Sequence, residues 1–173
     1  MTDAAPADPE MTAEFRRLMG LFTTGVCVVS AGLRGSDGAA PLMGMTVNSF
    51  VSVSLDPMLV CWSLQNTSSQ FDAWLAAEDF AISILAEQQQ AVARRYAARG
   101  SSGLIEGDFD WSESGLPLVK GALGHIECRQ WDTLKAGDHT MILGQVTAMD
   151  APETSDSAAP LGFFRGRFCR VSD

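Results

Sequence analysis

Short runs of apolar and β-branched residues, separated by turns, are the feature that most restricts the fold of this chain. Residues 26–31, 58–64 and 80–85 are such runs, and residues 123–131 and 140–147 form two more around a turn. Runs of this length and composition are typical of β-strands. They follow one another more often than they alternate with helices. The sequence therefore predicts a mainly β protein, an antiparallel barrel with packed helices, and not a doubly wound parallel sheet.

Helical periodicity is confined to short segments, so we expect two or three helices. It extends over residues 11–21 and 87–98, and Phe71, Trp74 and Leu75 form a third apolar stripe. The remainder predicts six or seven strands. Among the other segments, residues 42–55 are expected to be extended, 99–115 to form a long loop and 163–171 to form the last strand.

Size and composition indicate one soluble domain. The chain has 173 residues, of which 46% are hydrophobic and 19% charged, enough to bury one sizeable core. The Ala/Pro/Asp-rich residues 1–10 predict a flexible tail, which leaves residues 11–173 as the domain. The formal net charge of −9 argues against nucleic acid and anionic membranes as partners.

Several classes of site and location have no support in the sequence. The four cysteines form no CxxC pair and the chain has two histidines, so we expect no metal site and predict buried thiols in a reducing cytoplasm. The first ten residues do not resemble a signal peptide and no apolar run is long enough to cross a membrane. No GxGxxG fingerprint follows a predicted strand, so a nicotinamide cofactor would have to be held in another way.

Two polar segments next to predicted strands could hold a ligand. Residues 43–50 combine a glycine with Thr46, Asn48 and Ser49, which suits the close approach of a planar ligand or an ordinary strand start. Residues 63–70 join a buried strand to a helix and carry Ser, Thr and Asn. These residue types favour phosphate binding at a helix N-terminus and also simple N-capping.

Three further segments carry charge or aromatic rings, and each has two interpretations. Arg94, Arg95 and Tyr96 suit a phosphate contact or a solvated helix end. Asp138 before His139 suits a positioned imidazole at the barrel rim or an exposed hairpin residue. The aromatic residues and Arg within 160–166 suit stacking on a planar ring or core packing.

Taken in order, these segments resemble the flavin reductase-like, FMN-binding split-barrel family. The resemblance covers nearly all of residues 12–171 and is most specific over residues 44–57. The other residues that carry it are Phe15-Arg16-Arg17, residues 24–29, Gly137-Asp138-His139, Pro160-Leu161 and Phe164-Arg165-Gly166. One departure is Met58, where a second proline is frequent, and another is Gly162, where a bulkier apolar residue is frequent.

The resemblance implies a Greek-key split barrel that forms a homodimer and acts as an NAD(P)H:flavin oxidoreductase. FMN or FAD would accept hydride from NADH or NADPH, and reduced flavin would pass to a separate flavin-dependent monooxygenase. His139 would face and position the nicotinamide. Cofactor-binding residues implied in the same way are Met43, Gly44, Met45, Thr46, Asn48, Ser49, Ser63, Leu64, Gln65, Ser69, Arg95, Tyr96, Leu161, Phe163 and Phe164.

Two other functions are compatible with the same residues. One is a flavin-binding module without turnover, which would not need His139. The other is a flavoenzyme whose tightly held FMN reduces a different substrate. The sequence does not decide between NADH and NADPH, or between FMN and FAD.

Overall fold

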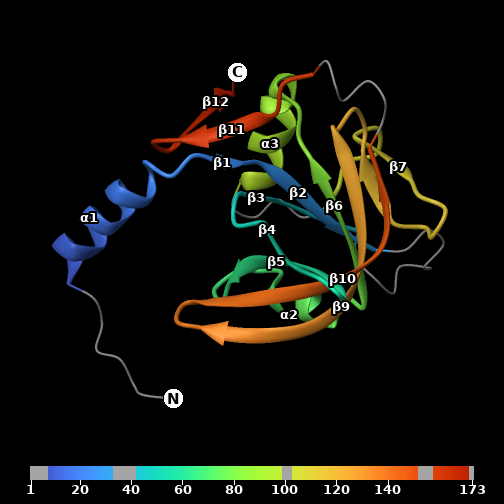
Figure 1. Ribbon diagram of the computed structural model, residues 1–173, viewed down its shortest axis with the longest axis horizontal. Helices are drawn as coiled ribbons and strands as arrows, with labels where there is room; N and C mark the ends of the chain where they lie inside the picture. Colours follow the sequence, from blue (N-terminus) through green and yellow to red (C-terminus); the bar gives the residue numbers. More distant parts are fainter. Residues whose placement is uncertain (1–7, 33–41, 99–102, 152–157, 172–173) are drawn as a thin grey trace.

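The computed structural model describes residues 8–32, 42–98, 103–151 and 158–171. Its largest part is an antiparallel seven-stranded sheet in the order β3-β2-β6-β9-β10-β5-β4. The bounds of these strands are β2 Cys27–Ala31, β3 Met43–Val47, β4 Val51–Leu55, β5 Met58–Gln65, β6 Asp79–Ile84, β9 Gly124–Ala136 and β10 His139–Asp150. The sheet curves round a core, and its two edge strands β3 and β4 follow one another in the chain (Figure 1). The predicted mainly β, split-barrel architecture is confirmed.

Two smaller sheets complete the strands. One has the order β1-β11-β12, formed by Thr24–Gly25, Leu161–Phe164 and Arg167–Arg170, and the other pairs β7 Phe109–Trp111 with β8 Pro117–Val119. The predicted single strand over residues 163–171 is therefore wrong. Arg165 and Gly166 turn the chain there with φ of 48° and 74°, so the segment is a hairpin. The predicted long loop over 99–115 likewise contains β7.

The helices are few and short, as predicted. They are α1 Pro9–Met19, α2 Phe71–Ala76, the 3-10 turn η1 Glu87–Gln89 and α3 Gln90–Ala97. α1 begins earlier than expected because Asp8 caps it, accepting a hydrogen bond from the Met11 amide at 3.4 Å. Residues 8–10 are therefore structured, while 1–7 lie outside the described residues. No described helix is long and apolar enough to span a membrane.

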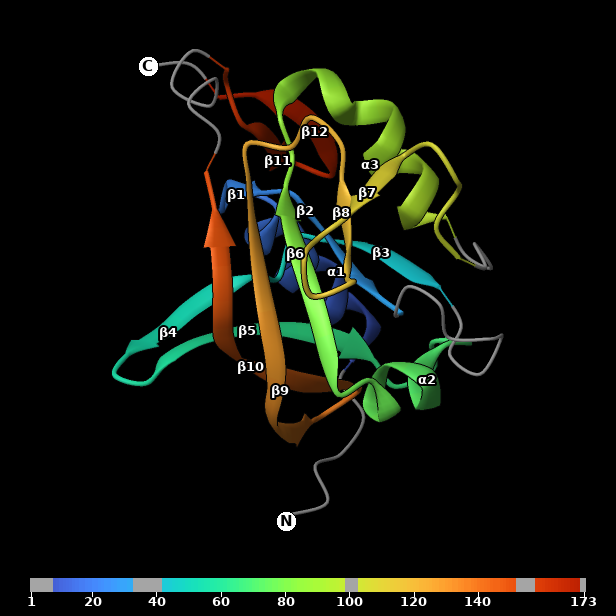
Figure 2. The ribbon, with the colours of Figure 1, turned by 90° about the vertical axis from the view of Figure 1, so that its right-hand side faces the viewer.

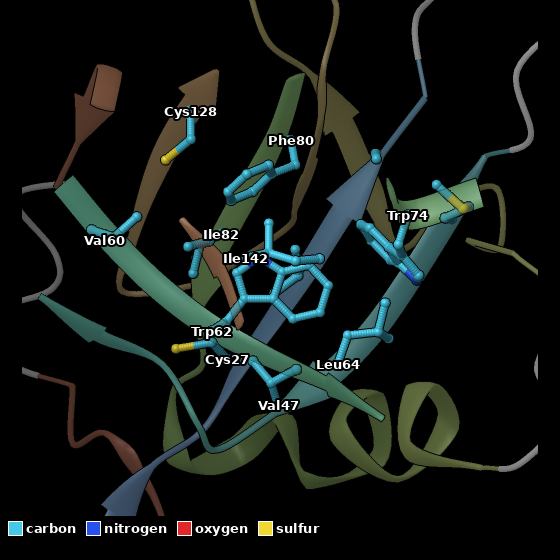
Figure 3. Close-up of a cluster of buried hydrophobic side chains, with 13 residues drawn as sticks. Cys27, Val47, Val60, Trp62, Leu64, Trp74, Phe80, Ile82, Cys128 and Ile142 are labelled. Atoms are coloured by element: carbon cyan, nitrogen blue, oxygen red, sulfur yellow. The ribbon is translucent and has the colours of Figure 1, made fainter. Parts of the chain in front are cut away.

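The main core lies inside the curved sheet and is built around two tryptophans. Trp62 from β5 meets Trp74 from α2 edge-to-face, with ring centroids 5.2 Å apart, and Phe80 lies 6.2 Å from Trp62 (Figure 3). Cys27 and Cys128 are buried in the same cluster, and Cys61 is buried as well. The predicted burial of these thiols is confirmed. Burial raises the pKa of Cys27 and Cys128 to about 12, and the neighbouring Glu127 adds to the effect at Cys128.

A second apolar cluster joins α3 to the outside of the sheet. Tyr96 and Ala93 of α3 pack there with Val28, Leu85 and Leu161. α3 lies against this side in both views of the ribbon (Figure 1 and Figure 2). The first cluster therefore holds α2 on the inner side of the sheet, and the second holds α3 on its outer side.

The predicted extended segment 42–55 is broken into β3 and β4 at residues 48–50. The alternation of Val51, Val53 and Leu55 with serines does not bury an apolar face within this chain. Val51, Val53 and Leu55 are 51%, 52% and 90% exposed. β4 is also an edge strand, which pairs only with β5.

Candidate functional site

A cleft of about 450 Å³ opens between β3, the segment after β5 and the end of α3. Three short stretches of chain line it. Its residues are Gly44, Met45, Leu64, Gln65, Thr67, Ser68, Ser69, Gln70, Tyr96, Ala97 and Ala98. The cleft thus brings together segments that the sequence analysis treated separately.

The wall between β3 and α3 is held closely. The Thr46 hydroxyl donates a hydrogen bond to the Ala93 carbonyl at 2.8 Å. A Cβ on Gly44 would come within 2.5 Å of Leu104 Cδ2 and 3.4 Å of the Tyr96 ring, which is too close for the side chain of Leu104 to remain where it is. Gly44 is therefore required by the approach of the neighbouring side chains behind the cleft.

Tyr96 belongs to a polar network behind the same wall. Its hydroxyl donates to Asp108 Oδ2 at 2.5 Å and accepts from the Ile105 amide at 3.1 Å, and Arg95 Nη1 pairs with the same carboxylate. Partial burial acts to raise the pKa of Asp108, but the hydrogen bonds from Arg95 and Tyr96 outweigh it and lower that pKa. Burial and the hydrogen bond to Asp108 raise the pKa of Tyr96. Both groups therefore stay fixed in charge near neutrality.

The opposite wall is the polar segment 66–70. The Ser68 amide donates to the Gln65 carbonyl at 2.9 Å and the Gln70 amide donates to Ser68 Oγ at 3.3 Å. α2 begins only at Phe71, with Gln70 as N-cap and no side-chain capping bond. Simple N-capping by the Ser, Thr and Asn residues of 66–69 is therefore not what the structure shows. Those residues form a turn whose members Thr67, Ser68 and Ser69 line the cleft.

The turn that carries His139 lies next to this segment. His139 pairs with Gln65 across β10 and β5. The Asn66 amide donates to the Asp138 carbonyl at 2.9 Å, and its side-chain nitrogen donates to the Gly137 carbonyl at 3.2 Å. Thr140 Oγ1 donates to Asn66 Oδ1 at 2.8 Å. Asn66 therefore locks the turn to the cleft wall.

His139 is partly exposed and oriented by its neighbour. Its Nδ1 lies 2.8 Å from Asp138 Oδ1, and its side chain is 43% exposed. The hydrogen bond and charge of His139 lower the pKa of the exposed Asp138 carboxyl. An ionised Asp138 favours the proton on Nδ1. His139 does not itself line the cleft.

Six of the predicted cofactor-binding residues line the cleft and the others do not. The six are Gly44, Met45, Leu64, Gln65, Ser69 and Tyr96. Met43 is buried in the main core, and Asn48 is exposed outside the cleft lining. Ser49 Oγ accepts from the Ser63 amide at 3.0 Å and so ties β5 to the segment after β3.

The three predicted residues of the last hairpin have different surroundings. Leu161 is completely buried in the second cluster, so its side chain has no surface to offer a ligand within this chain. Phe163 packs on Phe168 with ring centroids 5.5 Å apart, and Phe164 lies 5.1 Å below the Arg165 guanidinium. Stacking of Phe163 or Phe164 on a ligand would therefore compete with these contacts within the chain.

Five residues that line the cleft were not among the predicted site residues. They are Thr67, Ser68, Gln70, Ala97 and Ala98. The polar run 66–70 was a visible signal for the first three. Ala97 and Ala98 could not be identified from the sequence, because alanine has no functional group and these two residues line the cleft only through their position at the end of α3.

The lining suits a ligand that is planar and apolar at one end and hydroxylated or anionic at the other. Met45, Leu64 and the Tyr96 ring supply apolar surface, and residues 67–70 supply hydroxyl and amide groups. Within the described residues, no group of three or more His, Cys, Asp or Glu side chains could hold a metal ion. A flavin has both of the required parts, so the donor set fits that group.

Comparison with known proteins agrees with this chemistry. The FMN reductase (NADH) SmoA of Agrobacterium fabrum is 41% identical over 165 residues, which are 94% of this chain and 88% of that protein. The reductase component of the trigonelline monooxygenase of Acinetobacter baylyi is 37% identical over 155 residues, 90% of this chain and 47% of that protein. The chain therefore spans about half the length of the second relative.

A solved structure gives the same result for the fold. The NADH:FAD oxidoreductase SgcE6 of Streptomyces globisporus, in complex with NAD and FAD fragments, has a TM-score of 0.81 and 35% identity, with 98% of each chain covered. Residues 19–172 match the family model described as flavin reductase like domain. The chain belongs to the flavin reductase-like family.

Proposed function

We propose that this protein is an NADH:flavin oxidoreductase that binds FMN or FAD in the cleft and reduces it. The observation that carries the proposal is the cleft itself, in which apolar residues of β3 and α3 face the polar turn 67–70 next to His139. SmoA and SgcE6, which are similar over most of this chain, are named as NADH-dependent reductases of FMN and FAD.

Each wall of the cleft has a part in holding the flavin. Met45, Leu64 and Tyr96 would contact the ring system, and the backbone of Gly44 would support it from behind. Thr67, Ser68, Ser69 and the Gln70 amide group would bind the ribityl chain and phosphate. Arg95 is held by Asp108, so its part is to fix Tyr96 and the rim of the cleft.

A flavin held in the cleft would supply the redox chemistry, by accepting hydride from the nicotinamide. The protein orients the two rings and excludes water between them. His139 is assigned to position the nicotinamide through Nε2, because Asp138 holds its other nitrogen. Hydride transfer needs no side-chain base, so His139 has no acid–base role here.

The reduced flavin is proposed to leave and serve a separate monooxygenase. The relative from Acinetobacter baylyi is named as the reductase component of a flavin-dependent monooxygenase. The protein itself is proposed to form a homodimer. Phe15 of α1 and Phe22, which follows the helix, are 61% and 72% exposed, and exposed apolar area of this kind favours association.

The decisive measurement is the loss of absorbance at 340 nm with purified protein, NADH or NADPH, and FMN, FAD or riboflavin. We expect rapid NADH oxidation that depends on added FMN or FAD. Protein that binds flavin without turning over NADH would support the binding-module alternative. Tight FMN that does not exchange, with no dependence on added flavin, would support the alternative flavoenzyme.

A further inference from the structure

Asn66 lies next to the cleft assigned to flavin but does not line it. It follows directly on Gln65, the last residue of β5, and precedes Thr67. Both neighbours line the cleft, and Asn66 does not. Asn66 is partly buried, and its side chain hydrogen bonds to the β9–β10 turn, residues 136–139. It therefore connects two parts of the molecule that the proposed reaction uses together.

The backbone and both ends of the side-chain amide of Asn66 hold the turn. Its backbone amide donates to the Asp138 carbonyl at 2.9 Å, and its Nδ2 donates to the Gly137 carbonyl at 3.2 Å. Its Oδ1 accepts a hydrogen bond from Thr140 Oγ1 at 2.8 Å. Thr140 is only 5% exposed, so its hydroxyl fixes the orientation of the amide and keeps the Nδ2 donor towards the turn.

The turn has few other contacts that could hold it. Residues 131–138 are all exposed, and the turn lies at the free end of the β9–β10 hairpin (Figure 1). Chain with few buried contacts opens locally at a low cost in free energy. The hydrogen bonds from Asn66 therefore limit the movement of His139, which closes the turn opposite Ala136.

A ligand in the cleft would act on Asn66 through its neighbours in the chain. The Ser68 amide donates to the Gln65 carbonyl at 2.9 Å, which closes a tight turn with Asn66 at its second position. A ligand that orders Gln65 and Thr67 therefore also restricts Asn66. The hydrogen bonds of the Asn66 side chain pass this restriction on to the turn that carries His139.

We propose that Asn66 is a positioning residue for His139 and couples occupancy of the flavin cleft to the alignment of the nicotinamide. Flavin in the cleft fixes Asn66, and Asn66 fixes the turn. The assignment rests on the proposed reductase function and deepens it. Because such coupling is reciprocal, bound nicotinamide would strengthen the binding of flavin by the same factor.

The kinetic test begins with Asn66→Ala. A turn that samples more conformations lowers the fraction of protein ready for NADH, so the KM for NADH should rise about fivefold with little change in kcat. The Kd of FMN should change little, because the side chain does not line the cleft. Asn66→Asp keeps the size and the acceptor for Thr140 but places an oxygen against the Gly137 carbonyl, so it should raise the KM at least as much. The control is Gln88→Ala, which removes an exposed amide elsewhere.

A double-mutant cycle with His139→Ala separates positioning from a general effect on structure. If Asn66 acts through His139, adding Asn66→Ala to His139→Ala should not raise the KM for NADH further. Effects that multiply in the double variant would overturn the proposal. A wild-type KM in Asn66→Asp would also overturn it, because the Nδ2 donor would then have no part.

Thr140→Val tests the orientation of the amide. It keeps the shape of the side chain and removes the hydroxyl that donates to Asn66, so the KM for NADH should rise as in Asn66→Ala. Thr147→Val is the matched control on the same strand. It removes a hydroxyl that donates to the Glu127 carbonyl at 3.1 Å and should leave the KM unchanged. Equal KM values for the two threonine variants would contradict the role of Thr140 in holding Asn66.

Hydrogen exchange with FMN alone gives a readout that does not depend on turnover. In the wild type, FMN should slow the exchange of residues 67–70 and also of residues 136–140, each about fivefold. In Asn66→Ala, the protection of 67–70 should remain and that of 136–140 should be lost. Protection of 136–140 that persists in Asn66→Ala would show that the turn responds to flavin without Asn66, and the proposal would be wrong. A wild type that binds FMN without oxidising NADH would contradict the proposed function instead, and the exchange data would still decide the coupling.

Discussion

At the scale of single residues, Asp108 connects the fold to the flavin cleft. Asp108→Asn keeps the size of the side chain but weakens the hydrogen bond from Tyr96 and the ion pair with Arg95. Because hydrogen bonds to charged groups contribute about 1.5–3 kcal/mol, we expect a loss of stability in that range and a several-fold weaker affinity for FMN. Urea denaturation and flavin fluorescence titration measure the two effects. Asp110→Asn, an exposed neighbour paired with Lys120, is the control.

The same carboxylate makes a prediction about pH. The pKa of Asp108 is lowered in the folded protein from its ordinary value of 3.8. Its contribution to stability is therefore complete above pH 3.8 and is lost as the pH falls through the lower folded value. The acid limb of stability should be shallower in Asp108→Asn than in the wild type. Identical acid limbs for the two proteins would contradict this role.

Thiol reactivity tests the burial of the core. Cys27 and Cys128 have pKa values raised to about 12, and the buried Cys61 is raised as well, so at pH 8 none of the three presents a thiolate. Cys169 is partly exposed. A disulfide reagent should label about one thiol rapidly in the folded protein and all four after denaturation. Rapid labelling of a Cys169→Ser protein would show that the core is open.

At the scale of elements, the sequence predicted the main strands and helices better than it predicted the last hairpin and the lining of the cleft. The runs over β2, β5 and β6 are long and apolar, so their pattern is unambiguous. Gly166 signals the turn of the β11–β12 hairpin, but Arg165 before it adopts a left-handed conformation that is uncommon for a residue with a side chain, so the turn was not predicted. The cleft could be predicted only in part, because Ala97 and Ala98 contribute by their position at the end of α3.

Helix α2 gives the clearest prediction at this scale. It has six residues, too few to be stable in isolation, and Trp74 holds it to Trp62 in the core. Trp74→Ala should cost about 3–5 kcal/mol of stability, as for other buried aromatic residues. Because the polar segment 67–70 leads directly into α2, FMN affinity should fall as well. The control is Ala73→Ser, a small change at a position that is not fully buried.

At the scale of the whole molecule, the exposed apolar residues argue for a second copy of the chain. α1 has no buried residue, and Phe15 on it is 61% exposed. On β4, Leu55 is 90% exposed. A monomer that leaves both elements uncovered would expose large apolar patches, which monomeric proteins rarely do.

The prediction is that the wild type sediments as a dimer at micromolar concentration. Phe15→Glu and Leu55→Glu place a charge in the apolar surface, and each should shift the equilibrium towards monomer by at least tenfold in Kd, since burying an unpaired charge is costly. Gln88→Glu adds the same charge at an exposed polar site and should leave the dimer intact. If the wild type is a monomer both at high concentration and after 50-fold dilution, the homodimer proposal is wrong. If Phe15→Glu disrupts the dimer and Leu55→Glu does not, the interface contains α1 and not β4.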